Sequence, residues 1–196
     1  PSQRKLDGRG PLMTDTRIFI PSELFAPAES SRFEGVLALP FLEAGCDRYR
    51  FEEPLSWQVD VTNTGDALLV SGTVAGEAET ECARCLDGFA LPLAGEVEGY
   101  FLLDARDESP EDMDDDEFDM LPEDHVIDLE PLLKAALLLE LPLVPLCDEE
   151  CRGLCPSCGA NLNEGPCGCV REGEGGGDDA PPSPFSVLKD YPFEGR

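Results

Sequence analysis

The chain has 196 residues, of which 42 are acidic and 14 are Lys or Arg, giving a formal net charge of −28. This length suits one globular domain with a small appendage. Because phosphates repel such a chain unless its positive charge gathers on one face, the composition argues against non-specific binding of DNA or RNA. A basic protein is the better partner, although the same acidity also serves plain solubility or a salt-rich cytoplasm.

No stretch of the sequence is suited to cross a membrane. The most apolar run, residues 132–146, contains Lys134 and Glu140 and is interrupted by two prolines. Residues 1–21 have basic side chains but lack the apolar segment of a secretory signal. We therefore expect a cytoplasmic protein with no membrane partner. In that reducing compartment, its nine cysteines are not expected to form disulfides, and the close-spaced pairs are expected to be metal ligands or catalytic thiols.

A β-rich domain is predicted over residues 17–146, after a flexible N-terminus over 1–16. Apolar and polar residues alternate through residues 55–85, on both sides of a turn signal at Asn63-Thr64-Gly65-Asp66. Such alternation is typical of antiparallel strands.

Two further strands are predicted at residues 89–93 and 96–103, with Ala94-Gly95 as their connection. The natural architecture is an antiparallel meander or open barrel. Trp57 and Tyr100 occupy apolar positions of the pattern, and we expect both in the core.

Residues 107–124 hold eleven acids and no Lys or Arg, so we expect charge repulsion to keep most of this stretch a mobile loop. A helix follows over about 129–140. Asp128 is its predicted cap, Glu130 suits its first turn, and it should end before Pro142. Its apolar side is predicted to comprise Leu132, Leu133, Ala136, Leu137 and Leu139.

The C-terminal part of the sequence divides into three segments. Residues 147–169 are rich in cysteine, and in residues 170–184 seven of fifteen positions are Gly or Pro, which indicates a flexible linker. Residues 185–196 are predicted to be a docking tail, with Phe185, Val187 and Leu188 as its apolar contacts.

Eight of the nine cysteines come in close pairs, which make two sets of four. The set Cys155, Cys158, Cys167 and Cys169 has the spacing C-x2-C-x8-C-x-C and can close a metal-bound loop by itself, with residues 161–163 making the returning turn. Counting assigns the other set to Cys82, Cys85, Cys147 and Cys151, where a metal would clamp the β region to the segment after the helix. We therefore predict one or two structural Zn²⁺ ions, and an iron–sulfur cluster is the less favoured alternative. The ninth, Cys46, is expected to be a small buried apolar residue.

Catalytic uses of these cysteines have weaker support. Cys151, Cys155 and Cys158 match the C-x3-C-x2-C spacing of radical S-adenosylmethionine enzymes, but only 38 residues follow, which is too few for the barrel that such enzymes need. Cys82 and Cys85, in the sequence CARC, are not followed by the helix that a thioredoxin-like site requires. His125 is expected to be exposed, and no phosphate-binding glycine motif or acid/base pair is present. We predict no enzyme, no catalytic residues and no small-molecule substrate.

Five segments together resemble the YceD family, the large ribosomal RNA subunit accumulation proteins. They are ECARCLDGF, the acidic stretch, IDLEPLLKAALLLELPLVPLC, CRGLCPSCGANLNEGPCGC and SPFSVLK, in matching order over about residues 17–190. The resemblance implies a bacterial or plastid-type cytoplasmic factor that supports accumulation of large-subunit ribosomal RNA, without an established catalytic activity. The chain departs from the family pattern in its more acidic loop and longer tail, which weighs against direct RNA contact.

The sequence thus predicts an α+β protein: an antiparallel meander or open barrel with one packed helix and a Cys-rich zinc-knuckle region. Its expected role is that of a non-catalytic factor for large-subunit ribosomal RNA, acting through a ribosomal or ribosome-assembly protein. Two alternatives stay open. One is a thiol-based redox or metal-sensing protein, and the other is an acidic nucleic-acid mimic that binds a basic ribosomal protein.

Overall fold

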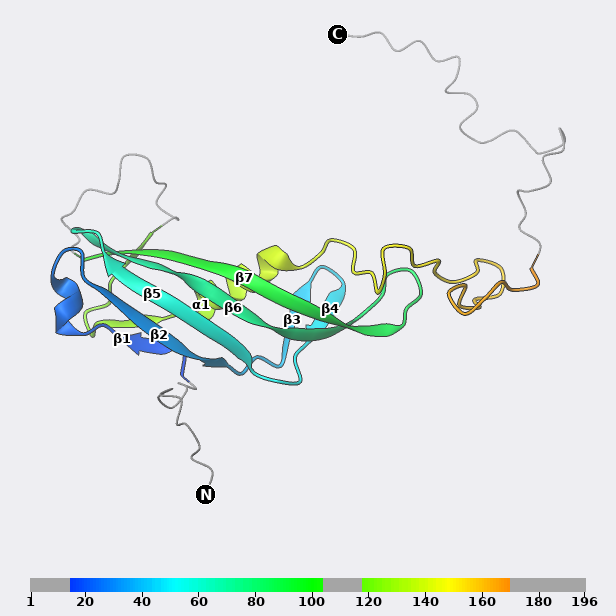
Figure 1. Cartoon of the computed structure of the whole chain (residues 1–196), viewed down its shortest axis with the longest axis horizontal. Coiled ribbons are helices and arrows are strands. Elements are labelled where there is room, and N and C mark those ends of the chain that lie inside the picture. The colour runs from blue at the N-terminus through cyan, green and yellow to red at the C-terminus, as the bar shows by residue number, and fades with distance from the viewer. Residues whose placement is uncertain (1–14, 104–117, 170–196) are drawn as a thin grey trace, which may run out of the picture. The chain divides into compact units, whose positions relative to one another are not determined.

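The computed structural model describes residues 15–103 and 118–169 (Figure 1). The predicted linker over 170–184 and the docking residues Phe185, Val187 and Leu188 lie outside the described residues, as does most of the predicted N-terminal segment. The chain divides into two compact units, Pro1–Gly153 and Leu154–Arg196. Each is described by itself below.

The first unit is built on an open, mostly antiparallel sheet of seven strands, not a closed barrel (Figure 1). Its longer strands lie side by side in the order β2, β5, β6 and β7. The β3–β4 hairpin joins β6 through the pair Arg50 and Glu79, and β8 lies parallel to the end of β7. The strands are β2 (Ser30–Leu37), β3 (Phe41–Ala44), β4 (Asp47–Arg50), β5 (Leu55–Asn63), β6 (Ala67–Glu81), β7 (Gly88–Leu102) and β8 (Asp119–Met120).

The β5–β6 hairpin confirms the predicted turn. Asn63 pairs with Leu68 at the end of the ladder, and Gly65 has a φ of 119°, which a residue with a side chain rarely adopts. The Asn63 amide is buried and makes two bonds: its Oδ1 accepts the N–H of Gly65 at 2.7 Å, and its Nδ2 donates to the carbonyl of Leu24 at 2.7 Å. The turn is thereby fixed to the short 3₁₀ helix Ser22–Phe25.

The predicted connection at Ala94-Gly95 is wrong, because β7 is one continuous strand of fifteen residues. Ala94 pairs with Ala75 and Gly95 with Val74 in the middle of the β6–β7 ladder. Gly95 serves a close approach instead of a turn. A Cβ on Gly95 would lie 2.6 Å from the carbonyl oxygen of Ala136, so the backbone of helix α1 (Glu130–Glu140) can pack directly on β7 only because that atom is missing.

Helix α1 begins one residue later than a cap at Asp128 implies, since Leu129 occupies the N-cap position. Asp128 still satisfies the first turn, because its Oδ1 accepts the N–H of Glu130 at 2.9 Å. Leu133, Ala136 and Leu137 are buried against the sheet. Leu139 is 84 % exposed, which corrects its predicted place on the buried side.

Trp57 lies in the core, as predicted, and is 2 % exposed. Tyr100, predicted in the core as well, is only half-buried. Tyr100 lies near the end of β7, where β6 and the short β8 are the neighbouring strands. Of the predicted acidic loop, residues 118–124 are described. Asp119 and Met120 form β8, and the N–H of Leu121 donates to the carbonyl of Leu102 at 2.9 Å, so this part is attached to the sheet edge.

A second, two-stranded sheet pairs β1 (Arg17–Phe19) with β9 (Val126–Asp128). His125 precedes β9 and is exposed, as predicted, with its ring 4.8 Å from that of Phe25. In the described part of the chain, no helix has the length and apolar character needed to span a membrane.

Candidate metal centres

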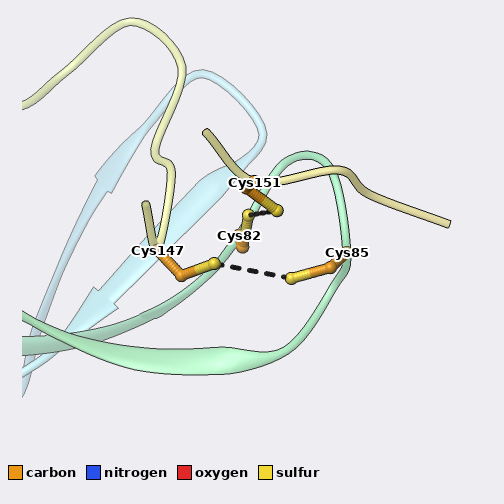
Figure 2. A group of neighbouring side chains, drawn as sticks. All are labelled: Cys82, Cys85, Cys147 and Cys151. Carbon is orange, nitrogen blue, oxygen red and sulfur yellow. Dashed lines mark hydrogen bonds between the residues drawn. The ribbon is translucent and has the colours of Figure 1, made fainter. Parts of the chain in front are cut away.

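The first group of four thiols joins two segments that are far apart in the sequence (Figure 2). Cys82 and Cys85 lie in the turn from β6 to β7, and Cys147 and Cys151 follow α1. The Sγ atoms of Cys85 and Cys147 are 3.6 Å apart, those of Cys82 and Cys151 are 3.7 Å apart, and all four lie within 4.8 Å of one another. A tetrahedral ion with metal–sulfur bonds of about 2.3 Å would place its sulfurs about 3.8 Å apart, so these four thiols fit such an ion.

The backbone around Cys82 is folded to support a thiolate. The N–H of Arg84 donates to the Cys82 sulfur at 3.4 Å, and the N–H of Leu86 donates to the Cys82 carbonyl at 2.9 Å. This turn requires a φ of 63° at Leu86, which is unfavourable for a residue with a side chain. The result is a tight turn in which the sulfurs of Cys82 and Cys85 lie within 4.8 Å of each other.

Arg84, between the two cysteines, attaches the second segment to the first. One nitrogen of its guanidinium donates to the carbonyls of Glu149 and Cys151, at 3.1 and 2.9 Å. The N–H of Ala83 also donates to the carbonyl of Pro145 at 2.8 Å. These bonds hold the two segments together besides any metal. Sequence reasoning missed this role of Arg84, although an arginine between two ligand cysteines was a visible signal.

The protonation of the first group is uneven. Burial opposes ionisation of Cys82, but N–H groups of Cys147, Cys85 and Arg84 outweigh it and lower the pKa of the thiol to about 6. The N–H of Asp87 favours ionisation of Cys85, but burial and the three neighbouring thiols raise its pKa. Partial desolvation of its sulfur is the first cause of the raised pKa of Cys147, although the residue as a whole is exposed. One thiolate is thus stabilised in advance, and a bound cation would favour ionisation of the others.

The second group of four thiols is closed within residues 155–169. The sulfurs of Cys155, Cys158, Cys167 and Cys169 lie within 4.8 Å of one another. The N–H of Gly159 donates to the Cys155 carbonyl at 2.8 Å, and the φ of Gly159 is 73°, so this turn repeats the geometry at Cys82 and Leu86. The predicted returning turn is present, because Asn161 Oδ1 accepts the N–H of Asn163 at 2.9 Å and Leu162 is buried.

Backbone N–H groups again prepare one thiolate in the second group. Those of Cys158 and Ser157 lower the pKa of Cys155 to about 6. At the other end, the Cys158 thiol, together with burial, raises the pKa of Cys169 to about 12. Both groups consist of thiols alone in the described part of the chain, which is the ligand set of a closed structural site.

Cys46 belongs to neither group and is exposed, which corrects its predicted burial. It lies between β3 and β4, where the short hairpin turn leaves little chain to cover its side chain. Its sulfur is 3.9 Å from Asp47 Oδ1.

In a comparison with known proteins, residues 70–190 match the family model described as "Large ribosomal RNA subunit accumulation protein YceD". An uncharacterized protein of Mycobacterium tuberculosis is 38 % identical over 115 residues, covering 57 % of this chain and 53 % of the relative. One of Mycobacterium leprae is 30 % identical over 112 residues, covering 56 % and 49 %. The chain thus spans about half the length of these relatives.

A plant protein matches over a shorter region. The "Large ribosomal RNA subunit accumulation protein YCED homolog 1, chloroplastic" of Arabidopsis thaliana is 38 % identical over 58 residues, covering 30 % of this chain and 18 % of the relative. No solved structure matches the chain significantly.

Proposed function

The chain belongs to the YceD family, and from that membership we propose that it supports the accumulation of large-subunit ribosomal RNA as a non-catalytic, zinc-stabilised protein. The name of the Arabidopsis relative describes the same role. In this proposal the chain acts in the cytoplasm by contacting a ribosomal or ribosome-assembly protein. Its charge of −28 favours a basic partner over direct contact with RNA.

The observation that carries the structural role of the metal is the composition of the two thiol groups. Each contains four cysteines, so a tetrahedral ion would have no open position for water or substrate. Catalytic zinc sites instead use three protein ligands and leave the fourth position free. Zinc is favoured over an iron–sulfur cluster because the four sulfurs of each group lie within 4.8 Å of one another, which suits a single ion, and in the first group two pairs are 3.6 and 3.7 Å apart.

Metal analysis of protein purified without air tests the zinc proposal. We expect about two zinc ions per chain and no visible absorption. Iron with a brown colour would contradict it. The matched control is Cys46→Ser, which removes an exposed thiol outside both groups and should leave the metal content unchanged.

Depletion of the protein in its host tests the cellular role. The ratio of large-subunit to small-subunit ribosomal RNA should fall and should recover on re-expression of the wild type or of Cys46→Ser. Cys82→Ser should fail to restore it, because that substitution removes a ligand of the clamp between β6 and the segment after α1. An unchanged ratio after complete depletion would contradict the proposed function.

A thiol-based sensor is the second candidate, because Cys147 and Cys158 are exposed and each belongs to one thiol group. Exposed thiolate ligands are open to oxidants, and their oxidation would release the metal. Titration with hydrogen peroxide distinguishes the two roles. Release of zinc at peroxide concentrations that leave cytosolic metabolism intact, reversed by a thiol reductant, would favour the sensor.

A further inference from the structure

We propose that the groove between α1 and the free edge of β7 binds an extended segment of a partner protein in which basic and apolar residues alternate. This inference extends the proposed function, in which the chain acts through protein contacts, by naming the chemistry of the partner. It rests on three features of one place: an unpaired strand edge, a partly exposed apolar stripe and a rim of carboxylates.

The unpaired edge belongs to β7. Within the described residues, β7 pairs along its whole length with β6, but on its other side only Phe101 and Leu102 have a partner, the short β8. Among the described residues, no strand pairs with residues 88–100 on that side, so their outward backbone groups are unpaired, except that Pro92 has no N–H to offer. Such an edge is a template for an added strand, whose main-chain hydrogen bonds supply affinity.

The apolar stripe lies on α1, next to that edge. Leu132, Ala135 and Leu139 share one side of the helix at spacings of three and four residues, and Leu139 is 84 % exposed. They line a groove of about 310 Å³ together with Ala136, Glu96, Glu98 and Glu140. Leu139 is the large exposed apolar side chain of this stripe, Leu132 is half-buried, and Ala135 is small and exposed. An exposed apolar side chain beside an open groove is typical of a binding surface.

The carboxylates determine the charge of the occupant. Glu96 and Glu98 alternate with the buried Gly95 and Val97, so their side chains lie on the face of β7 away from α1. Glu140 lines the groove at the end of the helix, and no basic residue of the described chain lines it. The nearby Lys134 is paired with Glu130 at 2.6 Å.

These positions predict a two-residue period in the occupant. In a strand added beside β7, side chains alternate between the two faces of the sheet. Those on the helix face would contact Leu132 and Leu139, and those on the other face would lie beside Glu96 and Glu98. Apolar residues suit the first set and Lys or Arg the second, because opposite charges across neighbouring strands are stabilising. A second copy of this chain fits poorly, since each copy carries a charge of −28.

Fluorescence anisotropy with labelled synthetic peptides tests the proposal on the full-length, metal-loaded chain. The probe is a peptide of about nine alternating Lys and Val residues, a usual length for a strand. The control has the same composition with its lysines grouped at one end. We expect the alternating peptide to bind at least about tenfold more tightly at about 0.15 M salt, where screening limits non-specific attraction. Equal binding of the two peptides would overturn the proposal.

Matched variants locate the site. Leu139→Ser should weaken binding about fivefold or more, whereas Leu143→Ser, which alters a 99 % exposed leucine outside the groove lining, should not. Glu96→Gln with Glu98→Gln should weaken it, whereas Glu52→Gln with Glu53→Gln changes the net charge equally at two exposed positions and should have little effect. If each groove variant weakened binding no more than its control, the peptide would be held by general attraction to the chain and not by the groove, and the proposal would be overturned.

Two further measurements exclude other occupants. Sedimentation tests whether a second copy of the chain occupies the groove. A wild-type dimer that is lost in Leu139→Ser would show that it does and would contradict the proposal. Removal of residues 183–196 should not change the affinity for the peptide. If binding appears only in this truncated chain, the chain's own tail is the occupant and the proposal is wrong. Peptide binding and the ribosomal RNA ratio are separate readouts, so a failure of this inference is distinguishable from a failure of the proposed function.

Discussion

Leu86 and Gly159 occupy the same place in two Cys-x-x-Cys turns, and their φ angles are 63° and 73°. In both turns the N–H of this residue donates to the carbonyl of the first cysteine, at 2.9 and 2.8 Å. Glycine adopts this conformation without strain, whereas a residue with a Cβ does so at a cost of roughly 1–2 kcal/mol. The thiol group that contains Cys82 thus includes a local strain that the other group lacks.

Leu86→Gly should raise the free energy of unfolding by about 1 kcal/mol, because it relieves this strain and removes a side chain that is already 62 % exposed. Urea unfolding of the metal-loaded protein measures the change. Ala83→Gly in the same turn is the control: its φ is not positive, so added backbone freedom should lower stability by roughly 0.5–1 kcal/mol. A destabilised Leu86→Gly variant would mean that the leucine side chain contributes packing.

Arg84→Ala should lower the free energy of unfolding by about 1–3 kcal/mol, since it removes two charge-assisted bonds to the carbonyls of Glu149 and Cys151. Arg32→Ala is the matched control. It removes the same charge from an exposed ion pair with Asp60, which should contribute no more than about 1 kcal/mol. Similar losses in the two variants, measured by thermal melting, would contradict a special role for Arg84.

At the scale of the elements, two glycines of β7 set the distance between the sheet and α1. A Cβ on Gly95 would lie 2.6 Å from the Ala136 carbonyl oxygen, and one on Gly99 would lie 2.7 Å from a methyl group of Leu132. Their separation of four residues keeps both on the face of the strand that α1 covers. This contact positions both the segment that carries Cys147 and the apolar stripe of the groove.

Gly95→Ala should therefore destabilise the fold by roughly 1–3 kcal/mol, because the added methyl group meets backbone that cannot move without displacing the helix. Gly88→Ala is the control at the start of the same strand, where the nearest atom to the new Cβ is 3.9 Å away. Urea unfolding should separate the two variants. Equal stability would show that α1 shifts freely on the sheet.

At the scale of the whole molecule, the two thiol groups belong to different units. The group with Cys82 lies within Pro1–Gly153, together with every residue of the buried core cluster, whereas the group with Cys155 lies within Leu154–Arg196. The first connects a strand turn to the segment after the helix, and the second closes a loop of its own. Their removal should accordingly have different consequences.

Cys82→Ser and Cys155→Ser should each reduce the metal content from about two ions to one. Only Cys82→Ser should lower the melting temperature of the sheet, because free energy of metal binding contributes to folding only of the segments that the metal joins. Metal analysis and melting followed by circular dichroism check both statements. A large drop in sheet melting for Cys155→Ser would contradict the independence of the two units.

The sequence by itself determined the features that depend on near neighbours. Alternation over residues 55–85 predicted the β5–β6 hairpin, the apolar period after Asp128 predicted α1, and cysteine spacing predicted the loop at Cys155. Each depends on backbone geometry within a few residues, which residue type and spacing reflect directly.

Tertiary structure decided what depends on distant contacts. Ala94-Gly95 has the composition of a turn, but pairing with β6 and the approach of α1 make it the middle of a strand. Leu139 continues the apolar period of the helix, yet no described element covers it. Counting cysteine pairs grouped the CARC turn with Cys147 and Cys151, but only the folded chain shows that Arg84 joins those segments. These outcomes follow from which surfaces meet, and spacing along the chain carries no such information.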